Sequence, residues 1–193
     1  MQTWDPEQYL KFFGPRVRPA LDLLNQIGLS NPKTVYDLGC GPGNVTTFIQ
    51  QKWPHARVIG VDSSQDMLAR AKEKYPNNVW INADLQDWEP TEPGDILFSN
   101  AVFQWISSHK ALLRRLLGHV RVGGVLAFQL PRNWDAPSHR IMHDLVAKSK
   151  HRERLERSLL HNPVGSPEYY YDLLSPYVND IDIWETEYLQ VLD

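Results

Sequence analysis

Residues 39–43 read Gly-Cys-Gly-Pro-Gly, and an apolar run over residues 34–38 leads directly into them. Residues 44–53 follow with the spacing of a helix. A glycine-rich turn between a buried strand and a helix lets the backbone approach a ligand closely, and the helix end offers unpaired N–H groups. The segment therefore predicts a binding turn at the end of a buried strand.

The same alternation continues along the chain. Further apolar runs, each of strand length, lie at residues 57–62, 78–83, 94–99 and 123–130, and helical patterns lie at residues 64–74 and 108–119. Short apolar runs that alternate with helices indicate parallel strands joined by crossover helices, with both faces of the sheet covered. We expect an α/β fold with a Rossmann-like, doubly wound sheet, and the 193 residues suit one domain.

The ends of the chain extend this core. Residues 6–28 predict a pair of short helices, kinked where Pro15 and Pro19 interrupt the pattern. Residues 138–160 and 167–176 are helical in pattern, and residues 180–191 predict a sixth, more polar strand. The single domain, residues 1–193, then divides into a helical lid (1–30), a cofactor-binding core (34–130) and substrate-side elements (131–193).

Three aspartates stand at the ends of three successive predicted strands: Asp37, Asp62 and Asp84. A carboxylate beside the glycine turn would repel a pyrophosphate but attract an ammonium or sulfonium group. Asp62 can accept the hydroxyls of a ribose, and Asp84 can accept a hydrogen bond from an adenine amino group. The alternatives are a purely structural turn, a helix cap at Asp62 and a solvated loop acid at Asp84. Asn44 stands where a dinucleotide fingerprint requires Gly or Ala, which disfavours a dehydrogenase.

This set of residues resembles the class I S-adenosylmethionine-dependent methyltransferases. The resemblance implies S-adenosylmethionine as cofactor, with the glycine turn and Asp37 facing its methionine part. It implies these cofactor-binding residues: Asp37, Gly39, Cys40, Gly41, Asp62, Ser63, Met67, Asp84, Leu85 and Asn100. Met67 would pack on the adenine or belong to the core. The family's sheet has seven strands, the last inserted between the fifth and sixth, and this last strand is missing here.

A second set of motifs narrows the resemblance. Trp4-Asp5-Pro6, Arg16-Val17-Arg18-Pro19-Ala20, Ser99-Asn100-Ala101, Gln104-Trp105 and Asn133-Trp134 resemble the family of methyltransferases that act on trans-aconitate. The implied reaction is methyl transfer to a carboxylate oxygen of a small polycarboxylate, which gives a monomethyl ester. A carboxylic acid is already ionised at neutral pH, so this reaction needs no general base.

The remaining carboxylates of such a substrate need cationic or hydrogen-bonding partners. We expect substrate-binding residues among Arg16, Arg18, Gln104, Trp105, Arg132, Asn133 and His139. Arg16 and Arg18 are two residues apart and cannot share one helical face, so one of them is favoured over both. Each arginine has the alternative of a surface charge, and Trp105 has the alternative of a core residue.

Several other classes of function are disfavoured. The net charge of −3 gives no reason to expect a nucleic-acid surface, and no apolar run is long enough to span a membrane. His139 and His143 lack a third metal ligand, so no metal site is expected, and Cys40 is interpreted as a small residue that fills the turn. A single cysteine fits a reducing cytoplasm. Three alternatives stay open: an acid bound to a carrier protein that docks on the basic run 148–157, another small-molecule acceptor such as a nitrogen, and a non-catalytic cofactor-binding module.

Overall fold

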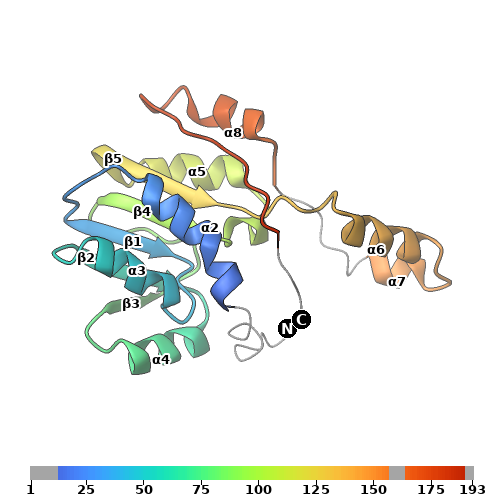
Figure 1. Ribbon diagram of the computed structural model, residues 1–193, viewed down its shortest axis with the longest axis horizontal. Helices are drawn as coiled ribbons and strands as arrows, with labels where there is room; N and C mark the ends of the chain where they lie inside the picture. The colour runs from blue at the N-terminus through green and yellow to red at the C-terminus, as the bar shows by residue number, and fades with distance from the viewer. Residues whose placement is uncertain (1–12, 157–163, 190–193) are drawn as a thin grey trace.

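The computed structural model describes residues 13–156 and 164–189. Its centre is a five-stranded parallel sheet in the order β3-β2-β1-β4-β5 (Figure 1). The strands are β1 (Thr34–Leu38), β2 (Arg57–Asp62), β3 (Val79–Asn82), β4 (Gly94–Asn100) and β5 (Val120–Gln129). The chain winds outward from β1 in one direction and then, from β4, in the other. Ligands of such sheets bind where this reversal occurs, beyond the carboxyl ends of the strands.

Helices cover both faces of the sheet (Figure 1). The described helices are α2 (Phe13–Gln26), α3 (Asn44–Lys52), α4 (Gln65–Lys74), α5 (His109–Leu117), α6 (Pro137–Ala147), α7 (Arg152–Glu156) and α8 (Pro167–Leu174), with a 3-10 turn η1 (Phe103–Trp105), and all but α6 and α7 lie against the sheet. Alternate side chains of β1 enter two cores. Val35 packs with α2 and α3, whereas Tyr36 and Leu38 pack with α5 and α8. All five residues of β1 are buried, as is typical of a strand that is covered on both faces.

The α/β, Rossmann-like fold is confirmed, and four of the predicted strands end within about one residue of their predicted bounds. The fifth strand begins at Val120, before the predicted Gly123, which lies inside it with a φ of +80°. Its first residues are not apolar enough to stand out, but Val120 pairs with Gly94 of β4.

The predicted break at Pro15 and Pro19 is wrong for the described part of the segment. Helix α2 is continuous from Phe13 to Gln26 with Pro19 inside it, whereas residues 6–12 of the prediction lie outside the described residues. Ala20, Leu23 and Leu24 bury their side chains against α3 and the sheet directly after Pro19. This tertiary packing offsets the hydrogen bond that the proline removes.

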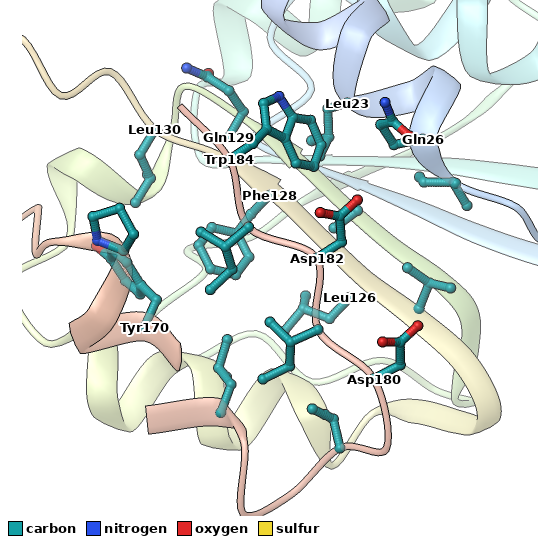
Figure 2. A pocket seen from close by; sticks show the side chains of 18 of the residues that line it. Leu23, Gln26, Leu126, Phe128, Gln129, Leu130, Tyr170, Asp180, Asp182 and Trp184 are labelled. Atoms are coloured by element: carbon teal, nitrogen blue, oxygen red, sulfur yellow. The ribbon is translucent and has the colours of Figure 1, made fainter. Parts of the chain in front are cut away.

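The sixth strand predicted over 180–191 is also wrong as far as the structure describes it. Residues 178–189 form no strand but run extended alongside β5. A cavity of about 840 Å³ lies between this segment and β5 (Figure 2). Ile181 packs against the core through its side chain, whereas Ile183 is exposed, so the alternation of apolar residues in this segment does not form a ladder with β5.

The predicted helix 138–160 is divided into α6 and α7 by a turn at residues 148–151, while 157–160 lie outside the described residues. Both helices extend away from the sheet and pack against each other (Figure 1). Neither buries a residue, and Ile141, Met142 and Leu145 of α6 are exposed. Within the described residues, no helix has the length and apolar character needed to cross a lipid bilayer.

Candidate functional site

The glycine turn after β1 is fastened to the next strand. The N–H groups of Gly39 and Cys40 both donate to the carbonyl oxygen of Val61, at 2.7 and 3.1 Å. Gly39, Gly41 and Gly43 all have positive φ, which glycine adopts without steric cost. A Cβ atom at Gly39 would lie 2.3 Å from Cγ2 of Val102, so there is no room for a side chain at this position.

Asp37 lies beneath this turn with only 2% of its surface exposed. Thr46 on α3 donates its hydroxyl proton to Asp37 Oδ2 at 2.6 Å. Burial raises the pKa of Asp37 to about 7, while the Thr46 hydrogen bond opposes this shift and the nearby Asp62 adds to it. A positively charged group bound next to this buried carboxyl would favour its ionised form and lower its pKa.

Asp62 joins the ends of two loops. Its Oδ2 accepts the Gly41 N–H at 2.8 Å and its Oδ1 accepts the Ser64 N–H at 2.8 Å. The carboxylate thereby holds the glycine turn and the start of α4 together. Each oxygen retains a second lone pair, so hydroxyl groups of a ligand can still donate to it.

The segment after Asp62 separates the two neighbouring serines. Ser64 is the N-cap of α4 and its hydroxyl accepts the Met67 N–H at 3.3 Å. Ser63, the predicted ligand residue, is exposed and its carbonyl accepts a hydrogen bond from Asn82 at 3.0 Å. Met67 is half-buried, so it belongs neither fully to the core nor fully to the surface.

Asp84 and Leu85 form the turn after β3. Asp84 is exposed, and its Oδ1 accepts the Gln86 N–H at 2.8 Å, whereas Leu85 is buried. Asp62 and Asp84 follow adjacent strands in register, since Asp62 pairs with Asn82 and the Ala83 N–H donates to the Asp62 carbonyl at 3.0 Å. The sheet thus brings the three predicted acids to one edge.

The end of β4 carries further polar groups at that edge. Ala101 adopts a φ of +56°, a strained value for a residue with a Cβ, and its N–H donates to the Gln129 carbonyl at 3.0 Å. Gln104, which is 9% exposed, donates its amide to the Ala101 carbonyl at 2.7 Å. Asn100 Oδ1 and Gln104 Oε1 are buried without a partner among the described groups. Buried orphan acceptors such as these fit a ligand that brings donors.

The surroundings of Trp105 and Cys40 test one prediction for each residue. Trp105 is 61% exposed, so the alternative that it is a core residue is wrong, because η1 turns it away from the interior that Phe103 fills. Cys40 is buried, and desolvation raises the pKa of its thiol far above the ordinary value, with Asp37 and Asp62 adding to the shift. A thiol held protonated suits a filler of the turn and not a nucleophile.

The predicted substrate residues lie on separate elements: Arg18 on α2, Gln104 and Trp105 in η1, Arg132 and Asn133 after β5, and His139 on α6. The side chain of Arg16 lies outside the described groups. Arg18 is exposed, with its guanidinium 5.0 Å from the Tyr188 ring, and Arg132 is hydrogen-bonded to Glu185. Asn133 is exposed, and His139 at the start of α6 lies against Trp134, with ring centroids 5.4 Å apart. The structure therefore brings the cofactor residues together more closely than the substrate residues.

The sequence reasoning missed some of the residues that shape the site. Thr46 and Arg115 are two of them, because each contacts a partner that only the fold brings near: Asp37 for Thr46, and the carbonyls of Leu85 and Trp88 for Arg115. Thr46 was detectable only as a polar residue on the buried face of α3, where it is fully buried. No group of three or more His, Cys, Asp or Glu side chains within residues 13–156 and 164–189 is arranged to hold a metal ion.

Comparisons with known proteins agree with this architecture. A family model described as "Methyltransferase domain" matches residues 35–124. The chain is 48% identical over 193 residues to a trans-aconitate 2-methyltransferase of Azoarcus sp. (strain BH72), with coverage of 100% of this chain and 76% of that protein. It is 41% identical over 189 residues to the protein of the same name from Yersinia pestis (strain Pestoides F), with coverage of 97% of this chain and 73% of that protein.

Solved structures show the same fold. The plantazolicin methyltransferase BpumL, in complex with a triazolic desmethylPZN analog and SAH, superposes with a TM-score of 0.57 at 19% identity, over 87% of this chain and 63% of that chain. The DhpI–SAH complex superposes with a TM-score of 0.54 at 26% identity, over 63% of this chain and 61% of that chain. With its glycine turn, three strand-end acids and this near full-length similarity, the chain belongs to the trans-aconitate 2-methyltransferase family of class I methyltransferases.

Proposed function

We propose that the chain transfers a methyl group from S-adenosylmethionine to a carboxylate oxygen of trans-aconitate, giving a monomethyl ester. The observation that carries this proposal is the identity of 41–48% to relatives named trans-aconitate 2-methyltransferase. When bound, the cofactor supplies an electrophilic methyl group on a sulfonium. A carboxylate oxygen is a sufficient nucleophile toward it, so the protein's task is alignment and exclusion of water.

The cofactor-binding residues divide the work by chemistry. Asp37 is buried on β1, and the neighbouring strand β4 ends in the orphan acceptor Asn100 Oδ1, followed by Gln104 Oε1; together these groups support binding of the cationic methionine part. The backbone of Gly39, Cys40 and Gly41 allows close approach there. Asp62, beside Ser63, supports ribose binding, and Asp84 with Leu85 supports adenine binding, with Met67 beside it. These assignments are proposals, and the shared sheet edge is what supports them.

The substrate side uses positive charge. Arg18 and Arg132 are exposed, and a guanidinium matches a carboxylate in geometry. Asn133, His139, Gln104 and Trp105 complete the proposed substrate set together with Arg16. Holding the reacting oxygen in line with the methyl group can lower the barrier by about 7–11 kcal/mol. The net charge of −3 supports a protein without a nucleic-acid partner. The single cysteine supports a location in a reducing cytoplasm.

A test with labelled methyl donor examines the proposal directly. The chain is incubated with S-[methyl-³H]adenosylmethionine and, separately, trans-aconitate, cis-aconitate, citrate or succinate. We expect label in a base-labile ester, with trans-aconitate as the preferred acceptor. Binding of S-adenosylhomocysteine without label transfer to any of these acids would contradict the proposal.

One observation favours a second candidate, a carrier-bound acid as the acceptor. The protruding arm formed by α6 and α7 exposes Ile141, Met142 and Leu145, and its far end carries basic residues at 148, 150, 152 and 154. An acidic carrier protein would match this surface in charge. Faster labelling of an acyl carrier than of free trans-aconitate would favour this candidate over the first.

A further inference from the structure

Arg115 on α5 is hydrogen-bonded to the turn that follows β3. Its guanidinium donates to two carbonyl oxygens of that turn, through Nη2 to Leu85 and through Nη1 to Trp88. The side chain is half-buried and reaches a segment 30 residues away in sequence. Because the guanidinium is a rigid planar fork, holding two carbonyls at once fixes both the position and the orientation of the turn.

The peptide group between Leu85 and Gln86 links the Arg115 guanidinium to the Asp84 carboxylate. Its carbonyl accepts from Arg115, and its N–H, which belongs to Gln86, donates to Asp84 Oδ1 at 2.8 Å. Hydrogen bonds in series polarise one another, so the charged donor at one end strengthens the bond at the other. Arg115 therefore acts on the orientation of the Asp84 carboxylate through a single peptide plane.

A second path runs through Trp88. The Trp88 N–H donates to the Asp84 carbonyl at 2.8 Å, while the Trp88 carbonyl accepts from Arg115. The indole of Trp88 is buried and meets the Tyr36 ring edge-on, with centroids 5.1 Å apart. The far end of the turn is thereby anchored to β1, and Arg115 holds Asp84 from both sides.

We propose that Arg115 is a positioning residue for adenine recognition. It holds the Asp84 carboxylate, by way of the 85–86 peptide, in the orientation in which Oδ2 accepts a hydrogen bond from the adenine 6-amino group. This inference rests on the proposed function, in which Asp84 faces the adenine. Arg115 itself touches neither the reacting atoms nor the ligand.

The test compares two ligands that differ only at that amino group: S-adenosylhomocysteine and its 6-deamino analogue, in which the base is purine and carries a hydrogen there. Their dissociation constants are measured by calorimetry for the wild-type chain, Arg115→Met and Arg115→Lys. The matched control is Arg114→Met, since Arg114 is exposed on the same helix and its guanidinium lies over the Tyr177 ring at 5.1 Å. It removes the same charge from the same helix without touching the turn.

We expect Arg115→Met to weaken S-adenosylhomocysteine binding about tenfold and to leave binding of the 6-deamino analogue within about twofold, because only the first ligand has a donor for the oriented carboxylate. Arg114→Met should keep the wild-type preference. A purely structural role for Arg115 would weaken both ligands equally, and an unchanged preference in Arg115→Met overturns the inference.

Three further outcomes are decisive. If Arg115→Met does not fold, Arg115→Lys, which keeps one donor, should show a reduced preference, and an undiminished preference there overturns the inference. If the wild-type chain binds both ligands equally, the adenine role of Asp84 and the inference fail while cofactor binding stands. If it binds neither, the proposed function itself fails.

Discussion

Asp37 makes the site sensitive to pH. Its pKa is raised from 3.8 to about 7 by burial, so the folded chain keeps the carboxyl protonated where the unfolded chain has lost the proton. The stability that this contributes is fully present below about pH 4 and is lost as pH rises to about 7. The free energy of unfolding should therefore fall across this window.

Replacing Asp37 by Asn removes this dependence. Above pH 8, Asp37→Asn should be more stable than the wild-type chain by about 2–4 kcal/mol, since each pKa unit corresponds to about 1.4 kcal/mol. Urea unfolding at pH 5, 6.5 and 8 measures this, with Asp172→Asn on the exposed face of α8 as control. The same variant should lose the tightening of S-adenosylhomocysteine binding that we expect between pH 6 and 8. Parallel pH profiles for wild type and Asp37→Asn would refute the role of this carboxyl.

Asp62 is a second residue whose replacement is informative. In Asp62→Asn, an amide NH₂ must face either the Gly41 N–H or the Ser64 N–H, so one donor loses its acceptor at a cost of about 1–3 kcal/mol. Equilibrium binding of S-adenosylhomocysteine, measured well below the melting temperature, should weaken at least about tenfold. Asp66→Asn in the first turn of α4 is the control, and equal affinities in the two variants would contradict the assignment of Asp62 to the ribose.

At the scale of elements, the glycine turn requires glycine for a steric reason. Gly39→Ala would put a Cβ at 2.3 Å from Val102 with φ at +73°, and we expect a loss of about 2–4 kcal/mol in unfolding free energy. Gly28→Ala is the matched control, because nothing lies within 4 Å of its added Cβ. Thermal unfolding of both variants tests the contrast. Similar melting temperatures would mean that the turn relaxes away from η1 at little cost.

The elements that could be predicted are those whose signal is local. The bounds of a buried strand are visible in its own residues, because a short apolar run stops where a polar residue or glycine follows. The predicted bounds of β1 and β2 are therefore the observed ones. Continuity of α2 through Pro19 depends on packing against α3, and the path of residues 178–189 depends on contacts with distant residues, such as that of Tyr188 with Asp22. No short window of sequence contains either contact.

The candidate site divides in the same way. The three acids and the glycine turn can each be recognised from a few consecutive residues, because each lies at the end of an apolar run of strand length. Thr46, nine residues from Asp37, and Arg115, 30 residues from Leu85, act only once the sheet has assembled. Their contacts are the part of the site for which the structure was needed.

At the scale of the whole molecule, residues 178–189 connect the two ends of the described fold. The Tyr188 hydroxyl donates to Asp22 Oδ2 on α2 at 2.6 Å while Arg18 lies over its ring, and Glu185 pairs with Arg132 after β5. Two of the proposed substrate arginines are therefore both in contact with one segment. A substrate carboxylate that used Arg132 would have to compete with the carboxylate of Glu185.

This competition gives a prediction for Glu185→Gln. If Arg132 binds substrate, removing the competing charge should lower the KM for trans-aconitate about two- to threefold, a modest change because the pair is exposed, and leave kcat and the affinity for S-adenosylhomocysteine unchanged. Glu187→Gln removes the same charge from an exposed position two residues on and serves as the control. An unchanged KM in Glu185→Gln would remove Arg132 from the substrate set, since an arginine released from its partner must bind the next carboxylate more readily. A raised KM would instead mean that Glu185 holds Arg132 in its binding orientation, and Arg132→Lys, which keeps the charge but loses the fork, should then raise KM as well.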